Sequence, residues 1–155
     1  MGRWKLSVFF TGYGSCGLIS LLALIELFRL SVCPNLTILN DTSGVIPSPF
    51  YPRHYPKNQR CSWQITTSKG KHIVLDVEYM DIENCGGCSC DYLEIKSGLS
   101  LDGNAAGRKC SYMSERITYY WFREGFKVLF VSNGNNRWYR GFRATFTQVN
   151  PTGKL

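Results

Sequence analysis

Residues 83–95 read ENCGGCSCDYLEI. Three cysteines lie in one short loop, with Glu83 at its start, Asp91 at its end and an alternating segment directly after it. Cysteines this close together, beside a period-two segment, are typical of small extracellular β-proteins that depend on disulfides. Two carboxylates at the ends of such a loop also indicate a place for a hard cation. The stretch favours a protein that binds over one that catalyses.

Composition predicts one globular domain with an end segment. The chain has 155 residues, of which 44% are hydrophobic and 14% aromatic, enough to bury a core. Its net charge is +7, a mild positive field that favours acidic proteins or sulfated glycans as partners. Nucleic acid is not an expected partner, because the cysteines indicate an extracellular chain.

The first 32 residues predict a targeting segment. Arg3 and Lys5 precede an apolar run at residues 18–28. A membrane span needs about 20 apolar residues, so this run is too short. We favour a cleaved signal peptide and a secreted protein. The alternative is an uncleaved signal-anchor, which would hold the chain on a membrane. Cleavage would remove Cys16 and leave six cysteines, an even number that can pair completely.

Two acceptor sequons for N-linked glycosylation follow the targeting segment. They begin at Asn35 and Asn40, close to Cys33. Together with the leader and the even cysteine count, they predict a secreted glycoprotein.

After Cys33 the pattern predicts short strands separated by turns. Three prolines in residues 48–56 exclude a helix there. We expect strands at residues 61–65, 72–82, 92–96, 117–122, 126–132 and 141–148, loop residues at 99–109 and a turn at 133–136. Within residues 72–82, one face should carry Ile73, Leu75, Val77 and Tyr79. The pattern predicts an all-β fold, an antiparallel β-sandwich.

A series of motifs extends from Cys33 to about Val149. In chain order they include Gly44-Val45-Ile46, Ser48-Pro49-Phe50-Tyr51-Pro52, Cys61-Ser62-Trp63, Asp91-Tyr92-Leu93-Glu94-Ile95, Phe130-Val131-Ser132 and Gly141-Phe142-Arg143-Ala144-Thr145-Phe146. In this order and spacing they resemble a CUB domain. The resemblance implies a jelly-roll-like sandwich of two antiparallel sheets over residues 33–149, followed by a tail at 150–155.

The same resemblance implies two disulfides, Cys33–Cys61 and Cys88–Cys110. Cys85 and Cys90 remain, and a bridge between them is the simplest use, although the close spacing leaves other pairings of the loop cysteines open. A zinc ion held by Cys85, Cys88, Cys90 and Cys110 is the alternative, against which the secretory context argues.

Many CUB domains hold calcium through a glutamate, an aspartate eight residues later and a second aspartate in a later loop. Glu83 and Asp91 have this spacing, but Asn133 stands at the third position. One negative charge is lost there, so the affinity for Ca²⁺ should fall; Asn135 or Asn136 are candidate helpers. Tyr55 matches a family tyrosine that hydrogen-bonds the acidic ligands. The alternative is that both carboxylates are solvated or pair with an arginine.

In the family, such acidic groups often accept a lysine or arginine side chain from a partner protein. By resemblance, the contact residues here are Tyr55, Glu83, Asp91 and Asn133. A second candidate surface is Arg137-Trp138-Tyr139-Arg140, with Arg143 nearby. Alternating arginine and aromatic residues suit sulfated glycans or an acidic protein. The alternative is an ordinary solvated hairpin whose aromatic residues pack on the sheet edge.

We do not expect an enzyme. The two histidines, His54 and His72, have no neighbours that suggest a triad or a metalloprotease helix. The favoured function is an extracellular protein-binding module that recognises a basic side chain with the support of calcium. The alternative is a calcium-independent glycan-binding or structural single-domain protein comparable to the spermadhesins, towards which Asn133 points.

Overall fold

The computed structural model describes residues 32–98, 105–121, 125–135 and 138–151. The chain divides into two compact units, Met1–Leu30 and Ser31–Leu155, and every described residue belongs to the second. No helix within these described ranges is long and apolar enough to cross a membrane. Apart from Val32, the predicted targeting segment at 1–32 lies outside the described residues.

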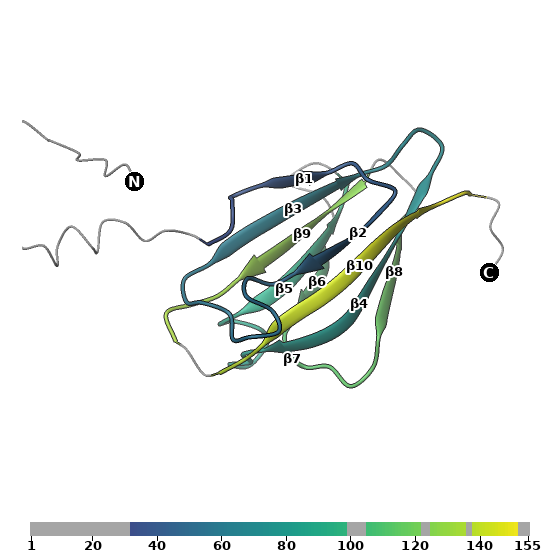
Figure 1. The fold of residues 1–155 in the computed structure, drawn as a ribbon. Helices are drawn as coiled ribbons and strands as arrows, with labels where there is room; N and C mark the ends of the chain where they lie inside the picture. Colours follow the sequence, from purple (N-terminus) through teal and green to yellow (C-terminus); the bar gives the residue numbers. More distant parts are fainter. Residues whose placement is uncertain (1–31, 99–104, 122–124, 136–137, 152–155) are drawn as a thin grey trace, which may run out of the picture. The chain divides into compact units, whose positions relative to one another are not determined.

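The described chain forms ten β-strands arranged in two sheets (Figure 1). In chain order they are β1 (Thr37–Leu39), β2 (Ser43–Pro47), β3 (Arg60–Thr66), β4 (His72–Ile82), β5 (Tyr92–Ser97), β6 (Ala105–Lys109), β7 (Ser111–Tyr112), β8 (Ile117–Trp121), β9 (Gly125–Val131) and β10 (Gly141–Val149). The first sheet has the order β1-β3-β9-β5-β6. The second has the order β2-β10-β4-β7, with β8 also paired to β4. The predicted all-β sandwich is confirmed.

The core lies between the sheets and is rich in phenylalanine. Phe126 and Phe130 of β9 alternate with outward residues, as do Phe142 and Phe146 of β10, and all four are at most 2% exposed. The rings of Phe130 and Phe142 lie 5.7 Å apart and join the two sheets. Burying a large apolar side chain contributes about 1.5–3 kcal/mol, so these alternating positions stabilise the sandwich.

Strand β4 departs from the expected alternation near its end. The sequence predicts Tyr79 on the same face as Val77, but Met80 is buried instead and Tyr79 is half-buried. The pairing explains this, because Arg143 pairs with Tyr79 while Ala144 pairs with Val77. One extra residue in β4 forms a bulge, which reverses the faces after it. This aspect of the prediction is wrong.

Strand β6 lies where the sequence predicts loop. Residues 99–109 lack apolar alternation, yet Ala105–Lys109 forms an edge strand that pairs with β5. Its first four residues are exposed, so no buried face had to appear in the sequence. Residues 99–104 of the predicted loop lie outside the described residues.

Candidate functional site

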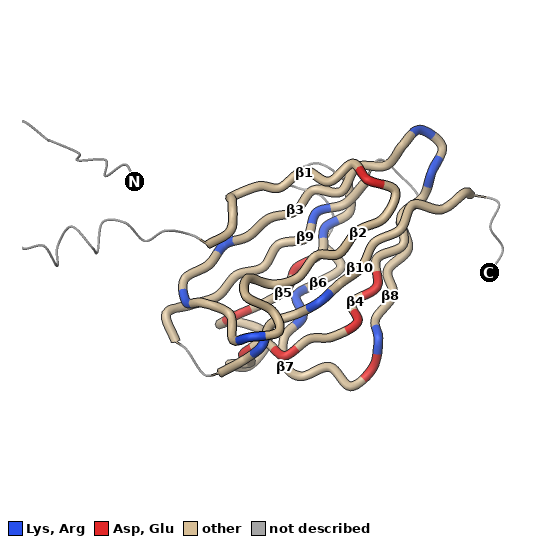
Figure 2. The backbone as a smooth tube through the Cα atoms, viewed as in Figure 1, with Lys and Arg blue, Asp and Glu red and all other residues tan. Residues whose placement is uncertain are grey.

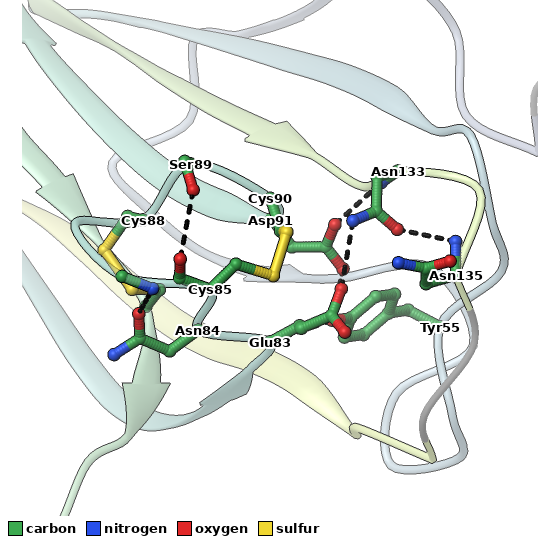
Figure 3. Close-up of a disulfide and its surroundings, with 12 residues drawn as sticks. Tyr55, Glu83, Asn84, Cys85, Cys88, Ser89, Cys90, Asp91, Asn133 and Asn135 are labelled. Carbon is green, nitrogen blue, oxygen red and sulfur yellow. Dashed lines mark hydrogen bonds between the residues drawn. A yellow bond between two sulfur atoms is a disulfide. The ribbon is translucent and has the colours of Figure 1, made fainter.

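Three strand ends and one loop supply the side chains of the predicted acidic site. Glu83 directly follows β4, Asp91 directly precedes β5, and Asn133 lies two residues after β9. Tyr55 comes from the loop between β2 and β3. Figure 3 shows all four gathered beside the cysteine loop. Tyr55 and Asn133 are far from Glu83 and Asp91 in the sequence, and all four residues meet at one end of the sandwich.

A closed set of hydrogen bonds fixes the two carboxylates. The Tyr55 hydroxyl donates to Asp91 Oδ2 at 2.6 Å and accepts from the Glu83 backbone N–H at 3.1 Å. The Asn133 backbone N–H donates to Asp91 Oδ1 at 2.7 Å, and its side-chain Nδ2 donates to Glu83 Oε2 at 3.0 Å. Both oxygens of Asp91 are therefore satisfied, and the carboxylates are held in place before any ligand arrives.

Burial makes this pair of carboxyl groups unusual. Glu83 is 3% exposed and Asp91 is 1% exposed. Burial raises the pKa of Asp91 above its ordinary value, hydrogen bonds from Tyr55 and Asn133 oppose the rise, and the charge of Glu83 adds to it. Burial and the hydrogen bond to Asp91 likewise raise the pKa of the Tyr55 hydroxyl, which stays a donor. Two carboxylates removed from water in this way favour the approach of a cation.

Asn133 takes an active part in this arrangement. Its side-chain amide donates to Glu83, while its Oδ1 accepts from the Asn135 N–H at 2.6 Å. A carboxylate at this position would instead bring a third negative charge beside Glu83. The amide therefore lowers the repulsion within the site. Asn136, the other predicted helper, lies outside the described residues.

The donor set fits calcium in part. Calcium prefers several hard oxygen ligands, and the carboxylates of Glu83 and Asp91 supply them. In the present orientation Asn133 points its Nδ2 towards Glu83, so it must turn its amide and release Asn135 before its Oδ1 can become a ligand. The Asn133 amide oxygen is therefore not oriented as a ligand in this structure.

The cysteine loop clamps the two acidic positions. Disulfides join Cys33 to Cys61, Cys85 to Cys90 and Cys88 to Cys110, with Cα–Cα distances of 5.5, 5.6 and 5.5 Å. The ligand-type atoms of Glu83, Cys85 and Cys90 lie within 4.8 Å of one another. Because the sulfurs are disulfide-bonded, they provide no thiolates, and the alternative of a four-thiolate zinc site is wrong.

The second predicted surface adjoins this site. The Tyr139 carbonyl accepts a hydrogen bond from the Tyr55 N–H at 3.2 Å, and Trp138 is 77% exposed. The Trp138 ring stands edge-on to His54, with their centroids 5.1 Å apart. Arg143 forms an ion pair with Glu78, which offsets its charge. Arg140 is exposed, and Arg137 lies outside the described residues.

Comparison with known proteins agrees with this geometry. Residues 33–146 match the family model of the CUB domain. The chain belongs to the CUB domain family. This CUB module is 33% identical to mouse procollagen C-endopeptidase enhancer 2, over 76% of the chain and 28% of the relative. It is 38% identical to human tolloid-like protein 2, over 70% of the chain and 10% of the relative. It therefore spans a small part of the length of these relatives.

One similar solved structure contains calcium. The crystal structure of the MASP-1 CUB2 domain bound to Ca²⁺ is 29% identical, has a TM-score of 0.62 and matches 72% of this chain and 96% of that chain. The family and these relatives indicate a protein-binding module.

A further feature is a cavity that the sequence analysis did not predict. It has a volume of about 170 Å³ and opens on the first sheet, and its lining residues are Asn35, Arg60, Ser62, Lys96, Lys127 and Leu129. The sequence contains one signal of this cavity, since each of three strands has a basic residue at a polar position. The partners of those strands are distant in the chain, so the cluster appears only once the sheet is paired.

Proposed function

We propose that this CUB module binds an extracellular partner protein by accepting one of its lysine or arginine side chains at Glu83 and Asp91. The observation that carries this proposal is a pair of buried carboxylates already held by hydrogen bonds. A cationic side chain meeting fixed carboxylates forms charge-assisted hydrogen bonds with little further ordering. The exposed Trp138, tied to the same loop through Tyr139, offers an aromatic contact beside the ion pair.

Calcium belongs to the same proposal. Glu83 and Asp91 would hold the ion, with the Asn133 amide oxygen as a third ligand after it turns. The ion would supply positive charge that offsets the repulsion between the carboxylates. The Ca²⁺-bound state of the similar MASP-1 domain supports this reading. Catalysis forms no part of the proposal.

Calcium titration of the secreted protein by calorimetry is the first test. Extracellular modules bind calcium with dissociation constants of about 10⁻⁴–10⁻³ M, and we expect one saturable site in this range. The double variant Glu83→Gln, Asp91→Asn should lose it. The variant Asp41→Ser, Glu115→Gln removes two exposed acidic charges and should keep it. Equal binding by both double variants, or no saturable binding by the wild type, would contradict the calcium part.

The variant Asn133→Asp separates calcium binding from binding of the basic side chain. It adds a third carboxylate, so calcium should bind roughly tenfold more tightly. Without calcium the same variant should be less stable than the wild type, because three carboxylates then lie together. If the wild type bound no calcium but retained a lysine-containing partner through Glu83 and Asp91, the carboxylates alone would account for recognition.

Acid should weaken calcium binding at an unusually high pH. Burial raises the pKa of Asp91. Protons therefore compete with calcium for this carboxylate at pH values above the usual aspartate pKa of about 4. Only the deprotonated form binds the ion, so affinity falls as pH decreases through the raised pKa. Titrations from about pH 7 down to about pH 4 should show this loss beginning above the usual aspartate pKa, with the far-ultraviolet circular dichroism unchanged. An affinity that stays constant down to about pH 4 would exclude Asp91 as a ligand.

Calcium-independent glycan binding through the turn at 137–140 has weaker support. The Arg143 charge is offset by Glu78, and the Arg140 backbone N–H donates to Asp81 Oδ2 at 3.2 Å, which brings a further acidic group beside the turn.

A further inference from the structure

The strands of the two sheets differ in the charged residues that they carry. The strands of the first sheet contain five Lys or Arg residues and one Glu, whereas those of the second contain one Arg and three acidic residues. Figure 2 shows acidic positions along β4, and basic positions on β3, β9 and β6. Ligands of the first sheet's outer face should therefore be anionic.

Strand pairing concentrates the basic side chains around the cavity. Lys96 of β5 pairs directly with Lys127 of β9, which brings their Cβ atoms to about 5 Å. Leu129 and Ser62 form the next row towards Arg60, and all of these residues line the 170 Å³ cavity. Outward-facing lysines directly opposite each other destabilise a sheet. An anion between them would remove this cost.

Few acidic groups on this face offset these cations. Glu94 lies 3.6 Å from Lys96 and also 3.6 Å from Arg108, so one carboxylate is shared between two cations. Within the described parts of the chain, neither Lys127 nor Arg60 has an ion pair with an acidic residue. The cavity therefore retains positive charge that the fold itself does not neutralise.

We propose that the outer face of the first sheet binds the sulfate groups of a sulfated polysaccharide, with one sulfate between Lys96 and Lys127 and a second at Arg60. Arg60 lies four residues along β3 from Gln64, the residue paired with Lys127. At about 3.3 Å per residue, the two positive ends are about 13 Å apart. That separation suits an extended chain bearing repeated anions, and one isolated ion cannot span it.

The lining of the cavity favours a glycan over an acidic protein. Protein interfaces depend on buried aromatic or aliphatic anchors, and this cavity has one apolar lining residue, Leu129. Its other lining groups are cations, a hydroxyl and an amide, which match sulfates and sugar hydroxyls. This surface differs in residues and in charge from the acidic site at the strand ends. An experiment can therefore contradict one of the two proposals without affecting the other.

Heparin-affinity chromatography of the full secreted protein tests the proposal. The wild type should be retained at about 0.15 M salt, and Lys96→Gln, Lys127→Gln should weaken heparin binding on the order of tenfold or more. The matched control Arg53→Gln, Lys69→Gln removes two exposed charges elsewhere and should elute close to the wild type. Equal shifts in the two double variants would overturn the site.

Competition experiments identify the anion. Heparin should displace the bound protein, whereas desulfated heparin and polyglutamate should not at the same mass concentration. Inorganic sulfate should compete only at far higher concentration, because it cannot occupy both positive ends together. Equal competition by polyglutamate would indicate an acidic protein as the ligand and overturn the proposal, and equal competition by desulfated heparin would do the same.

Asn35 needs its own control, since it lines the cavity and begins a sequon. An N-glycan there would cover the lysine pair. Heparin retention is therefore measured in the wild type and in Asn35→Gln, with Asn40→Gln as the matched variant. The Asn40 side chain lies elsewhere and accepts from the Thr66 hydroxyl at 2.8 Å. Failure of both the wild type and Asn35→Gln to bind heparin would overturn the proposal.

Discussion

Replacing Gly141 by alanine should destabilise this CUB module by about 2–5 kcal/mol, a large fraction of the stability of a small domain. A Cβ at this position would lie 1.9 Å from Ser48 Oγ and 2.7 Å from Ser48 Cβ. Gly141 also has a φ of +86°, a left-handed conformation that alanine adopts only with strain. The clash with Ser48 and the backbone strain therefore both destabilise this variant.

Ser48 has no easy way to move aside. It is 2% exposed, and its Oγ accepts a hydrogen bond from the Phe142 N–H at 3.0 Å. Displacing it would leave a buried donor without a partner, which costs about 1–3 kcal/mol. The alanine Cβ would also lie 3.3 Å from Tyr55 Cδ1, so the strain would reach the residue that positions Asp91.

Urea unfolding of the secreted domain measures this effect, and Gly98→Ala is the matched control. Gly98 has a φ of +77°, and an added Cβ there would meet nothing within 4 Å, so it carries the backbone strain without the clash. We expect a loss of about 1 kcal/mol there. If Gly141→Ala were no more destabilising than Gly98→Ala, the predicted clash between the new Cβ and Ser48 would be contradicted.

The second large effect concerns the disulfides, whose loops differ in length. The Cys33–Cys61 bridge spans 28 residues, whereas Cys85–Cys90 spans 5. Loop-closure entropy predicts losses of about 3.5 kcal/mol and about 2 kcal/mol when each pair is replaced by serine. Cys61 is also fully buried, so a serine hydroxyl there adds a desolvation cost.

The effects of these two variants on calcium affinity should follow the opposite order to their effects on stability. Cys85–Cys90 lies within the loop between Glu83 and Asp91, so its loss should weaken calcium binding even where the domain stays folded. The Cys33–Cys61 variant should bind calcium normally in whatever fraction is folded. Chemical unfolding together with calcium titration of both variants checks this ranking. A Cys85→Ser, Cys90→Ser protein with unchanged calcium affinity would show that the clamp does not organise the carboxylates.

The features that could be predicted from the sequence were those encoded locally. The alternation of Phe142, Ala144 and Phe146 specifies an inward face wherever β10 pairs, and the sandwich followed from such segments. The face of Tyr79 could not be predicted, because the bulge depends on the register of β4 against β10, which no single strand encodes. Nor could β6, because an exposed edge strand needs no apolar pattern.

The acidic site was predictable for a different reason. Glu83 and Asp91 bracket one short loop, so their spacing in the chain already limits their separation in space. The direction of the Asn133 amide could not be predicted, since it depends on Asn135 and on the burial of Glu83. Nor could the pairing of Lys96 with Lys127, which joins strands separated by three others in the chain.

The excess of basic residues on the strands of the first sheet gives the sandwich an electric dipole across its thickness. Near a polyanionic matrix, this dipole exerts a torque that turns the first sheet towards the matrix and the second away before any contact forms. The encounter is therefore oriented rather than random. A module adsorbed in this way leaves its strand ends facing sideways, so a partner moving along the same matrix would meet Glu83 and Asp91 by diffusion in two dimensions.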